Sequence, residues 1–232
     1  YARAGYERDD FFVRASWSQN NVSNSNETVP VLAPFVVSGD KNGNPFNIPF
    51  LTNSYDLVSQ YSYAIGSTHR VTLGANYRHN TLSGTAVSGL SQENRFGVYL
   101  QDEWRLLQTL TLTAGIRMDT HSEIDPTYSP RVALIYAPHP NHTFRLSGSV
   151  AYKPPTLVET NADLRTTTTI FGFSTTNVGQ GSHTLKPERI TSYEAEYQGW
   201  FLDHRARVRL TVFDNHIADV IEAVGLSPTF GT

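Results

Sequence analysis

Hydrophobic and polar residues alternate with a period of two along most of the chain. Residues 70–78 show this pattern clearly, because polar residues or glycine there alternate with Val71, Leu73, Ala75 and Tyr77. Such alternation predicts a β-strand with one apolar face and one polar face. The pattern recurs and predicts about ten strands, at residues 1–6, 11–19, 55–65, 70–78, 95–106, 110–119, 129–136, 143–152, 189–201 and 205–216. No segment shows convincing helical periodicity, so we expect an all-β protein.

The connections between these strands alternate between short and long. The short ones are residues 7–10, 66–69, 107–109, 137–142 and 202–204, and the long ones are 20–54, 79–94, 120–128 and 153–188. An up-and-down meander gives this order when all its short turns lie at one end and all its long loops at the other. Outer-membrane β-barrels have this asymmetry. A half-exposed antiparallel sheet of a soluble protein gives the same alternation within each strand but has no reason to keep the loop asymmetry.

Arginines fall on the polar positions of the predicted strands. An arginine at the lipid midplane costs about 2–4 kcal/mol, so a barrel must direct it into the lumen. We therefore predict a lumen-facing set of arginines: Arg70, Arg117, Arg145, Arg205, Arg207 and Arg209. For the last three, the alternative is ion pairing with Glu194 and Glu196 of the preceding strand.

Trp17, Trp104 and Trp200 lie at predicted strand ends, where the aromatic girdle of a membrane barrel is expected. These features together predict an antiparallel up-and-down transmembrane β-barrel. Residues 1–232 open and close without the lead-in or final strand of a complete barrel, so we expect an internal part of a larger one.

Composition narrows the function. The chain is 12% aromatic and 17% charged, has a net charge of −3 and contains no cysteine. The absence of cysteine excludes a disulfide scaffold, a cysteine zinc site and a thiol nucleophile, and the net charge argues against a nucleic-acid binder. No run of 18 apolar residues predicts a transmembrane helix. His139 and His142 lack a third metal ligand, and no nucleophile elbow, phosphate loop or dinucleotide motif occurs. We expect no enzyme activity, metal or cofactor.

Several strings then indicate a family. Tyr99–Trp104 reads Tyr-Leu-Gln-Asp-Glu-Trp, Leu110–Asp119 follows Leu-Thr-x-x-x-Gly-x-Arg-x-Asp, and Ser129–Arg131 reads Ser-Pro-Arg. Residues 153–159 resemble an Arg/Lys-x-Pro-x-x-x-Glu segment offset by one proline, and Leu185–Glu188 reads Leu-Lys-Pro-Glu. In this order and with these spacings, roughly residues 55–222 resemble the barrel domain of TonB-dependent outer-membrane receptors.

The resemblance implies a roughly 22-stranded barrel closed by an N-terminal plug. It implies a receptor in the outer membrane of a Gram-negative-type bacterium that takes up a ferric siderophore or a similar scarce nutrient. Its energy comes through TonB. Residues 1–232 would then supply part of the barrel, with the plug and the C-terminal strands outside them. The alternatives are a passive porin-like or adhesin-like barrel and a soluble all-β binding module.

The long outer connections are where ligand contacts are expected. Aromatic and arginine side chains above a barrel mouth suit an iron chelate of negative charge. This interpretation selects Arg165, Phe171 and Phe173 in residues 153–188 and Phe35 in residues 20–54. The alternative is that these residues pack the loops together or form hairpins that extend the barrel.

Overall fold

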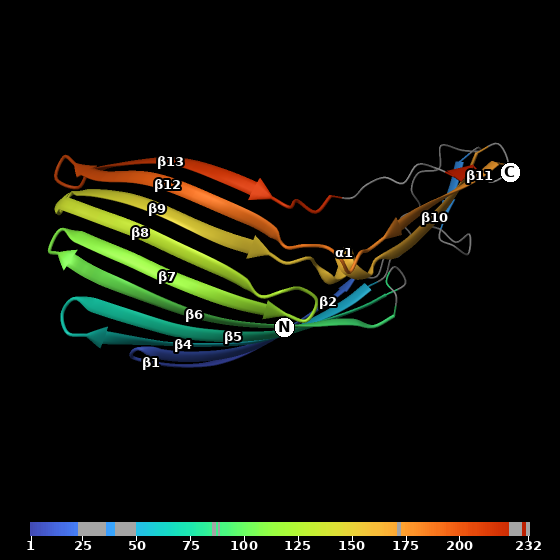
Figure 1. Ribbon diagram of the computed structural model, residues 1–232, viewed down its shortest axis with the longest axis horizontal. Coiled ribbons are helices and arrows are strands. Elements are labelled where there is room, and N and C mark those ends of the chain that lie inside the picture. The colour runs from blue at the N-terminus through green and yellow to red at the C-terminus, as the bar shows by residue number, and fades with distance from the viewer. Residues whose placement is uncertain are drawn as a thin grey trace.

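The computed structural model describes residues 1–22, 36–39, 50–84, 87, 89–170, 173–222 and 229–230, with the backbone alone for 36–39, 164–170, 173–178 and 229–230. Ten strands form one antiparallel sheet in the order β1-β2-β4-β5-β6-β7-β8-β9-β12-β13 (Figure 1). They are β1 Ala2–Arg8, β2 Phe11–Val22, β4 Phe50–Ile65, β5 His69–Gly84, β6 Ser91–Leu107, β7 Leu110–His121, β8 Thr127–His139, β9 His142–Lys153, β12 Glu188–Phe201 and β13 Ala206–Ala218. The all-β prediction and the meander order of ten strands are confirmed.

All the short turns lie at one end of this sheet and the longer connections at the other, as Figure 1 shows. We call them the turn end and the loop end. Hairpin turns at residues 9–10, 66–68, 108–109, 140–141 and 202–205 form the turn end, and residues 23–49, 85–90, 122–126 and 154–187 connect strands at the loop end. The predicted asymmetry is therefore present.

Several strands are longer than the alternation predicts, and the excess lies at the loop end. β4 begins at residue 50 rather than 55, β5 continues to 84 rather than 78, and β6 begins at 91 rather than 95. About 9–11 residues suffice for a tilted strand to cross a bilayer. Beyond that length no lipid contacts the outer face, so apolar residues are not required there and the alternation fades.

The longest connection contains secondary structure of its own. β10 (Asp163–Ile170) and β11 (Phe173–Gln180) form a hairpin in a second sheet of order β14-β11-β10-β3, with β3 at Val36–Gly39 and β14 at Thr229–Phe230. The pairing of β3 with β10 joins the backbones of two long outer connections. This agrees with the alternative in which these connections form hairpins.

A one-turn helix, α1 (Leu157–Asn161), precedes the hairpin, which corrects the expectation of a chain without helix. Its first turn carries a reciprocal capping box, in which the backbone N–H of Glu159 donates to Thr156 Oγ1 and the backbone N–H of Thr156 donates to Glu159 Oε2. Five residues are too few for helical periodicity to appear in the sequence.

One face of the ten-stranded sheet is apolar and remains exposed within the chain. The register places one apolar residue of each of six successive strands in a single row, formed by Trp104, Leu112, Leu134, Leu146, Ala195 and Val212. Among the described residues, only Leu82 and Leu157 are buried hydrophobic side chains. A sheet that buries so few hydrophobic side chains leaves its apolar face exposed, and a surface of this kind is normally covered by another molecule. No described helix is long and apolar enough to cross a membrane.

Candidate functional site

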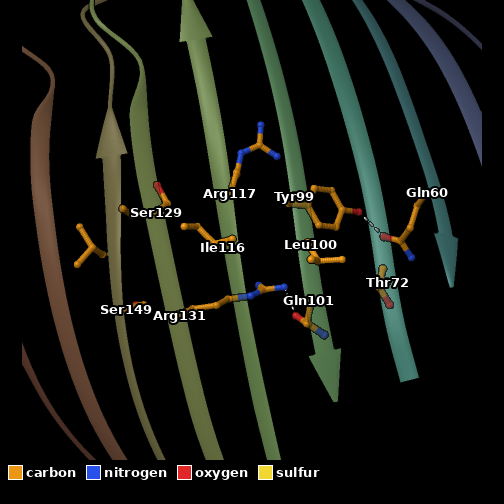
Figure 2. Close-up of a pocket in the computed structure, with 12 residues that line it drawn as sticks. Gln60, Thr72, Tyr99, Leu100, Gln101, Ile116, Arg117, Ser129, Arg131 and Ser149 are labelled. Atoms are coloured by element: carbon orange, nitrogen blue, oxygen red, sulfur yellow. Dashed lines mark hydrogen bonds between the residues drawn. The ribbon is translucent and has the colours of Figure 1, made fainter. Parts of the chain in front are cut away.

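The polar face of the sheet is its concave face, because its side chains meet across intervening strands. Tyr99 Oη donates to Gln60 Oε1 over β5, and Arg117 Nη2 donates to Asn76 Oδ1 over β6. Arg131 reaches Gln101 over β7 in the same way. Side chains of next-but-one strands converge only on the concave side of a curved sheet. A hollow of about 580 Å³ is lined by residues of these contacts, among them Gln60, Tyr99, Arg117 and Arg131 (Figure 2), and we call this concave polar surface the inner wall.

Two glycines of the inner wall make these long contacts possible. Gly74 lies between Gln60 and Tyr99 in the register, and Gly97 lies between Asn76 and Asp119. A Cβ atom on Gly74 would collide with the Tyr99 ring, and one on Gly97 would collide with side-chain atoms of its neighbours. The absence of a side chain at both positions therefore lets the residues on either side bond over the strand.

Four arginines of the inner wall pair with carboxylates. Arg117 Nε donates to Asp119 Oδ2 at 2.7 Å. The other ion pairs join Arg70 Nη2 to Asp10 Oδ1 at 3.0 Å, Arg145 Nη1 to Glu194 Oε1 at 3.7 Å and Arg209 Nε to Glu196 Oε1 at 3.5 Å. The register places Arg70, Arg117, Arg145 and Arg209 on one face. Arg209 thus has the glutamate partner that the alternative interpretation named.

The turn end differs from the sequence prediction at two positions. Arg205 lies in the turn between β12 and β13 rather than in a strand, because residues 202–204 adopt positive φ angles and end β12. Arg207 pairs in register with Trp200, and its guanidinium lies 5.5 Å from the Trp200 ring centroid. Trp200 therefore shares the arginine face, in contrast to the membrane-interface position expected for it. The sequence did contain a sign of this position, because Trp200 lies an even number of residues after Glu194 and Glu196 and so shares their face of the strand.

The other two tryptophans lie on the apolar face. Trp17 lies near the middle of β2, five residues before its loop end, and pairs with Tyr55, while Trp104 lies three residues from the turn end of β6. The Trp104 ring stacks on His69 with centroids 5.2 Å apart. Their role as membrane-interface aromatics stays a prediction.

The predicted ligand-contact residues lie where little is described. Phe35 and Phe171 are outside the described residues, and Arg165 and Phe173 are placed by backbone alone. Arg165 pairs with Val178 and Phe173 with Ile170 across the β10–β11 hairpin. Their role in ligand binding stays a prediction.

The two proline-containing strings of the resemblance meet at the loop end. Lys153 Nζ lies 3.0 Å from Glu188 Oε2 and 3.9 Å from Glu159 Oε1. Glu188 Oε1 also accepts a hydrogen bond from the backbone N–H of Ile221 at 2.9 Å. These contacts close the base of the longest connection and tie it to the chain that follows β13.

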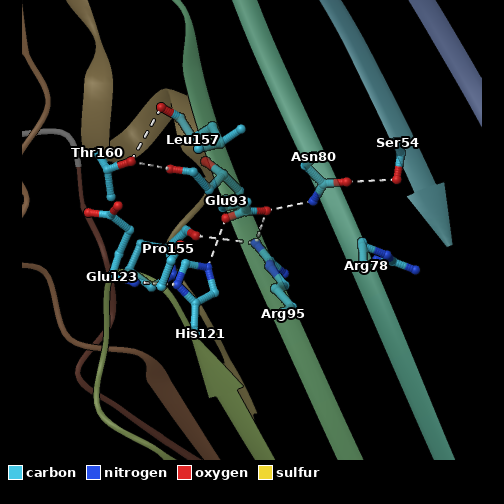
Figure 3. Close-up of polar contacts among 12 residues, drawn as sticks. Ser54, Arg78, Asn80, Glu93, Arg95, His121, Glu123, Pro155, Leu157 and Thr160 are labelled. Atoms are coloured by element: carbon cyan, nitrogen blue, oxygen red, sulfur yellow. Dashed lines mark hydrogen bonds and ion pairs between the residues drawn. The ribbon is translucent and has the colours of Figure 1, made fainter. Parts of the chain in front are cut away.

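Sequence reasoning missed a buried polar cluster at the loop end of the inner wall (Figure 3). Only 2% of Glu93 is exposed. Its Oε1 accepts a hydrogen bond from Asn80 Nδ2 at 2.5 Å and lies 2.8 Å from Arg95 Nη2, and its Oε2 lies 2.8 Å from His121 Nε2. We call these four residues the Glu93 cluster. The sequence pattern assigned Glu93 to a loop. The remaining sign of its position was that it lies two residues before Arg95, a spacing that places both side chains on the same face of a strand.

The described residues offer no obvious metal centre. His139 and His142 face each other in the β8–β9 turn, with ring centroids 5.9 Å apart. Nowhere in the described ranges do three or more histidine or acidic side chains form a group that could hold an ion. The polar contacts of the inner wall described above are hydrogen bonds and ion pairs.

A curved antiparallel wall with an apolar outside, a polar inside and all its long loops at one end defines a β-barrel membrane protein. Over residues 1–232 the chain matches the family model described as TonB dependent receptor-like, beta-barrel, and it belongs to that family. This is a family of receptors and transporters rather than of enzymes. Its barrels are outer-membrane proteins of Gram-negative bacteria, which places this chain in that membrane.

Individual relatives agree with this membership. The chain is 32% identical over 161 residues to the ferric enterobactin receptor of Pseudomonas aeruginosa, a match that covers 64% of this chain and 21% of that receptor. A crystal structure of a variant of that receptor superposes with a TM-score of 0.69 at 19% identity, covering 93% of this chain and 34% of the receptor chain. The siderophore receptor PirA of Acinetobacter baumannii gives a TM-score of 0.65 at 15% identity, covering 89% and 32%. The chain thus spans about a fifth of the curated relative and about a third of these solved chains.

Proposed function

We propose that this chain supplies part of the barrel wall and outer loops of a TonB-dependent receptor that imports a ferric siderophore. The observation that carries the proposal is the 32% identity to a ferric enterobactin receptor within a chain whose whole length matches the family. In this proposal the plug and the segment that contacts TonB belong to parts of the receptor outside these 232 residues.

The inner wall supports this role physically. A plugged barrel must hold its plug by polar contacts and still let it move or rearrange during transport. The ion-paired arginines present donors on a surface of balanced charge, and a guanidinium can bind several partners in one plane. A passive, porin-like barrel would not need TonB, and this difference separates the two functions.

Uptake by the intact receptor tests the proposal. The full-length gene is expressed in a Gram-negative host strain that lacks its own ferric enterobactin receptors. Entry of radioactive iron from ferric enterobactin is then measured with and without a functional TonB. We expect uptake only when both the receptor and TonB are present. Equal uptake without TonB would support a passive barrel. A receptor that does not bind ferric enterobactin would exclude this siderophore as its ligand. A ferric hydroxamate serves as the control ligand.

A further inference from the structure

Two partners of Glu93 also hold the backbone of outer connections. Arg95 Nη2 donates to the carbonyl oxygen of Pro155 at 3.5 Å, within residues 154–187. His121 Nδ1 accepts a hydrogen bond from the backbone N–H of Glu123 at 3.0 Å, within residues 122–126. One buried carboxylate thus fixes two side chains, and each of these binds a different connection (Figure 3).

The helix α1 brings in a third connection. Ala162, directly after the helix, forms an antiparallel bridge with Val87 in residues 85–90. The helix contacts β5 and β6. Leu82 near the end of β5 and Leu157 in α1 are 1% and 9% exposed. The Arg95–Pro155 bond just before α1, the Ala162–Val87 bridge just after it and the contacts of the helix with β5 and β6 therefore dock α1 on the inner wall.

The position of α1 fixes both ends of the β10–β11 hairpin. β10 begins at Asp163, two residues after the helix ends. On the return strand, Gly181 N–H donates to the carbonyl oxygen of Ala162 at 2.8 Å and Ser182 N–H donates to that of Glu159 at 3.1 Å. A Cβ atom on Gly181 would meet the backbone of Thr160 at 2.6 Å, so the two chain segments lie in close contact.

We propose that Glu93 is a positioning residue that docks α1, and with it the base of the β10–β11 hairpin, at a fixed place over the inner wall. The proposal rests on the proposed function, because Arg165 and Phe173 on this hairpin are the residues we expect to contact a ferric siderophore. Glu93 itself does not touch the ligand. It limits the orientations of the hairpin, so its loss lowers the fraction of receptors that are competent to bind.

The first test measures the mobility of α1 and needs no ligand. Val158 in α1 is 51% exposed and these 232 residues contain no cysteine, so Val158→Cys gives one labelling site for a nitroxide within them, introduced into a full-length receptor whose other cysteines, if any, are replaced by serine. We expect an immobilised label with Glu93 in place, a mobile label in Glu93→Ala and an intermediate one in Glu93→Gln. Glu103→Gln is the matched control, because Glu103 is exposed on the same face of β6 at the turn end. Unchanged mobility in Glu93→Ala would overturn the proposal.

The second test asks whether docking alone restores binding. In Glu93→Ala, a docked fraction of about one in ten would weaken ferric enterobactin binding about tenfold. Val87→Cys with Ala162→Cys places two thiols at the antiparallel bridge, and paired residues there meet the distance that a disulfide needs. We expect oxidation of this pair to restore binding in Glu93→Ala, and reduction to weaken it again.

The outcomes separate the two proposals. One outcome is that the Glu93→Ala receptor reaches the outer membrane but binds ferric enterobactin weakly both before and after oxidation of the cysteine pair. That result would show that Glu93 does not act through α1, and it would overturn the positioning role. If the unmodified receptor fails to bind ferric enterobactin, the proposed function fails for that ligand, and the spin-label measurement still decides the role of Glu93.

Discussion

At the scale of single residues, the inner wall depends on positions where a side chain is absent. Gly74 and Gly97 sit under contacts that join next-but-one strands. Glycine in a strand normally weakens it, since it has no side chain to pack. Here the missing Cβ leaves room for side-chain hydrogen bonds that pass over the glycine strand, in addition to the backbone bonds between neighbouring strands. These side-chain bonds join β4 to β6 and β5 to β7.

Gly74→Ala tests this directly. The new methyl group would force the Tyr99 ring away from Gln60, and we expect the full-length receptor to lose about 1–3 kcal/mol of stability, the usual cost of overpacking. The measurement is urea unfolding of the purified receptor in detergent. Gly148→Ala is the control, because a Cβ there meets its nearest neighbour at an ordinary 3.5 Å. Equal loss in both variants would contradict the role of Gly74.

At the scale of elements, each strand carries two faces that must meet different surroundings. Leu146 pairs with Leu134 and Ala195 on the apolar face, whereas the adjacent Arg145 lies on the inner wall near Glu194. Successive residues of a strand point to opposite sides, so a shift of one position along the strand moves a side chain from the lipid-facing side to the lumen-facing side.

We expect Leu146→Arg to block assembly of the full-length receptor into the outer membrane, because an arginine facing hydrocarbon costs up to about 2–4 kcal/mol. Arg145→Ala should assemble normally, since it removes a partly exposed ion pair that is worth little. Heat-modifiable migration of the receptor in outer-membrane fractions measures assembly. Similar behaviour of the two variants would refute the assignment of faces.

At the scale of the whole molecule, the ten-stranded sheet is an open wall. β1 and β13 are its edges, and each pairs with one neighbour among the described strands. Unpaired backbone groups are not tolerated at a sheet edge in hydrocarbon. Closure of the barrel therefore needs partners for both edges.

Residues 1–232 expressed alone with an export signal should consequently fail to form a monomeric barrel and should be degraded or aggregate in the periplasm. The full-length receptor in the same host should insert. Protease resistance of the outer-membrane fraction distinguishes the two. A stable, protease-resistant monomer of the 232 residues would contradict the open-wall interpretation.

The sequence by itself determined the strands, their order and most of their faces. Alternation with a period of two is a local property, so it could place Arg117 on the polar face and Leu146 on the apolar face without knowledge of any partner strand. The lengths of the connections likewise revealed which end carries the loops. The sequence pattern also located the arginines that form the ion pairs of the inner wall.

Only the tertiary structure decided which side chains meet. Tyr99 reaches Gln60 over Gly74 because register and curvature bring next-but-one strands together, and neither is encoded within one strand. The Glu93 cluster joins side chains of β5, β6 and β7, and its Arg95 also bonds Pro155, which is 60 residues further along the chain. Bonds between distant segments follow from sheet geometry, which no local pattern of hydrophobic and polar residues contains.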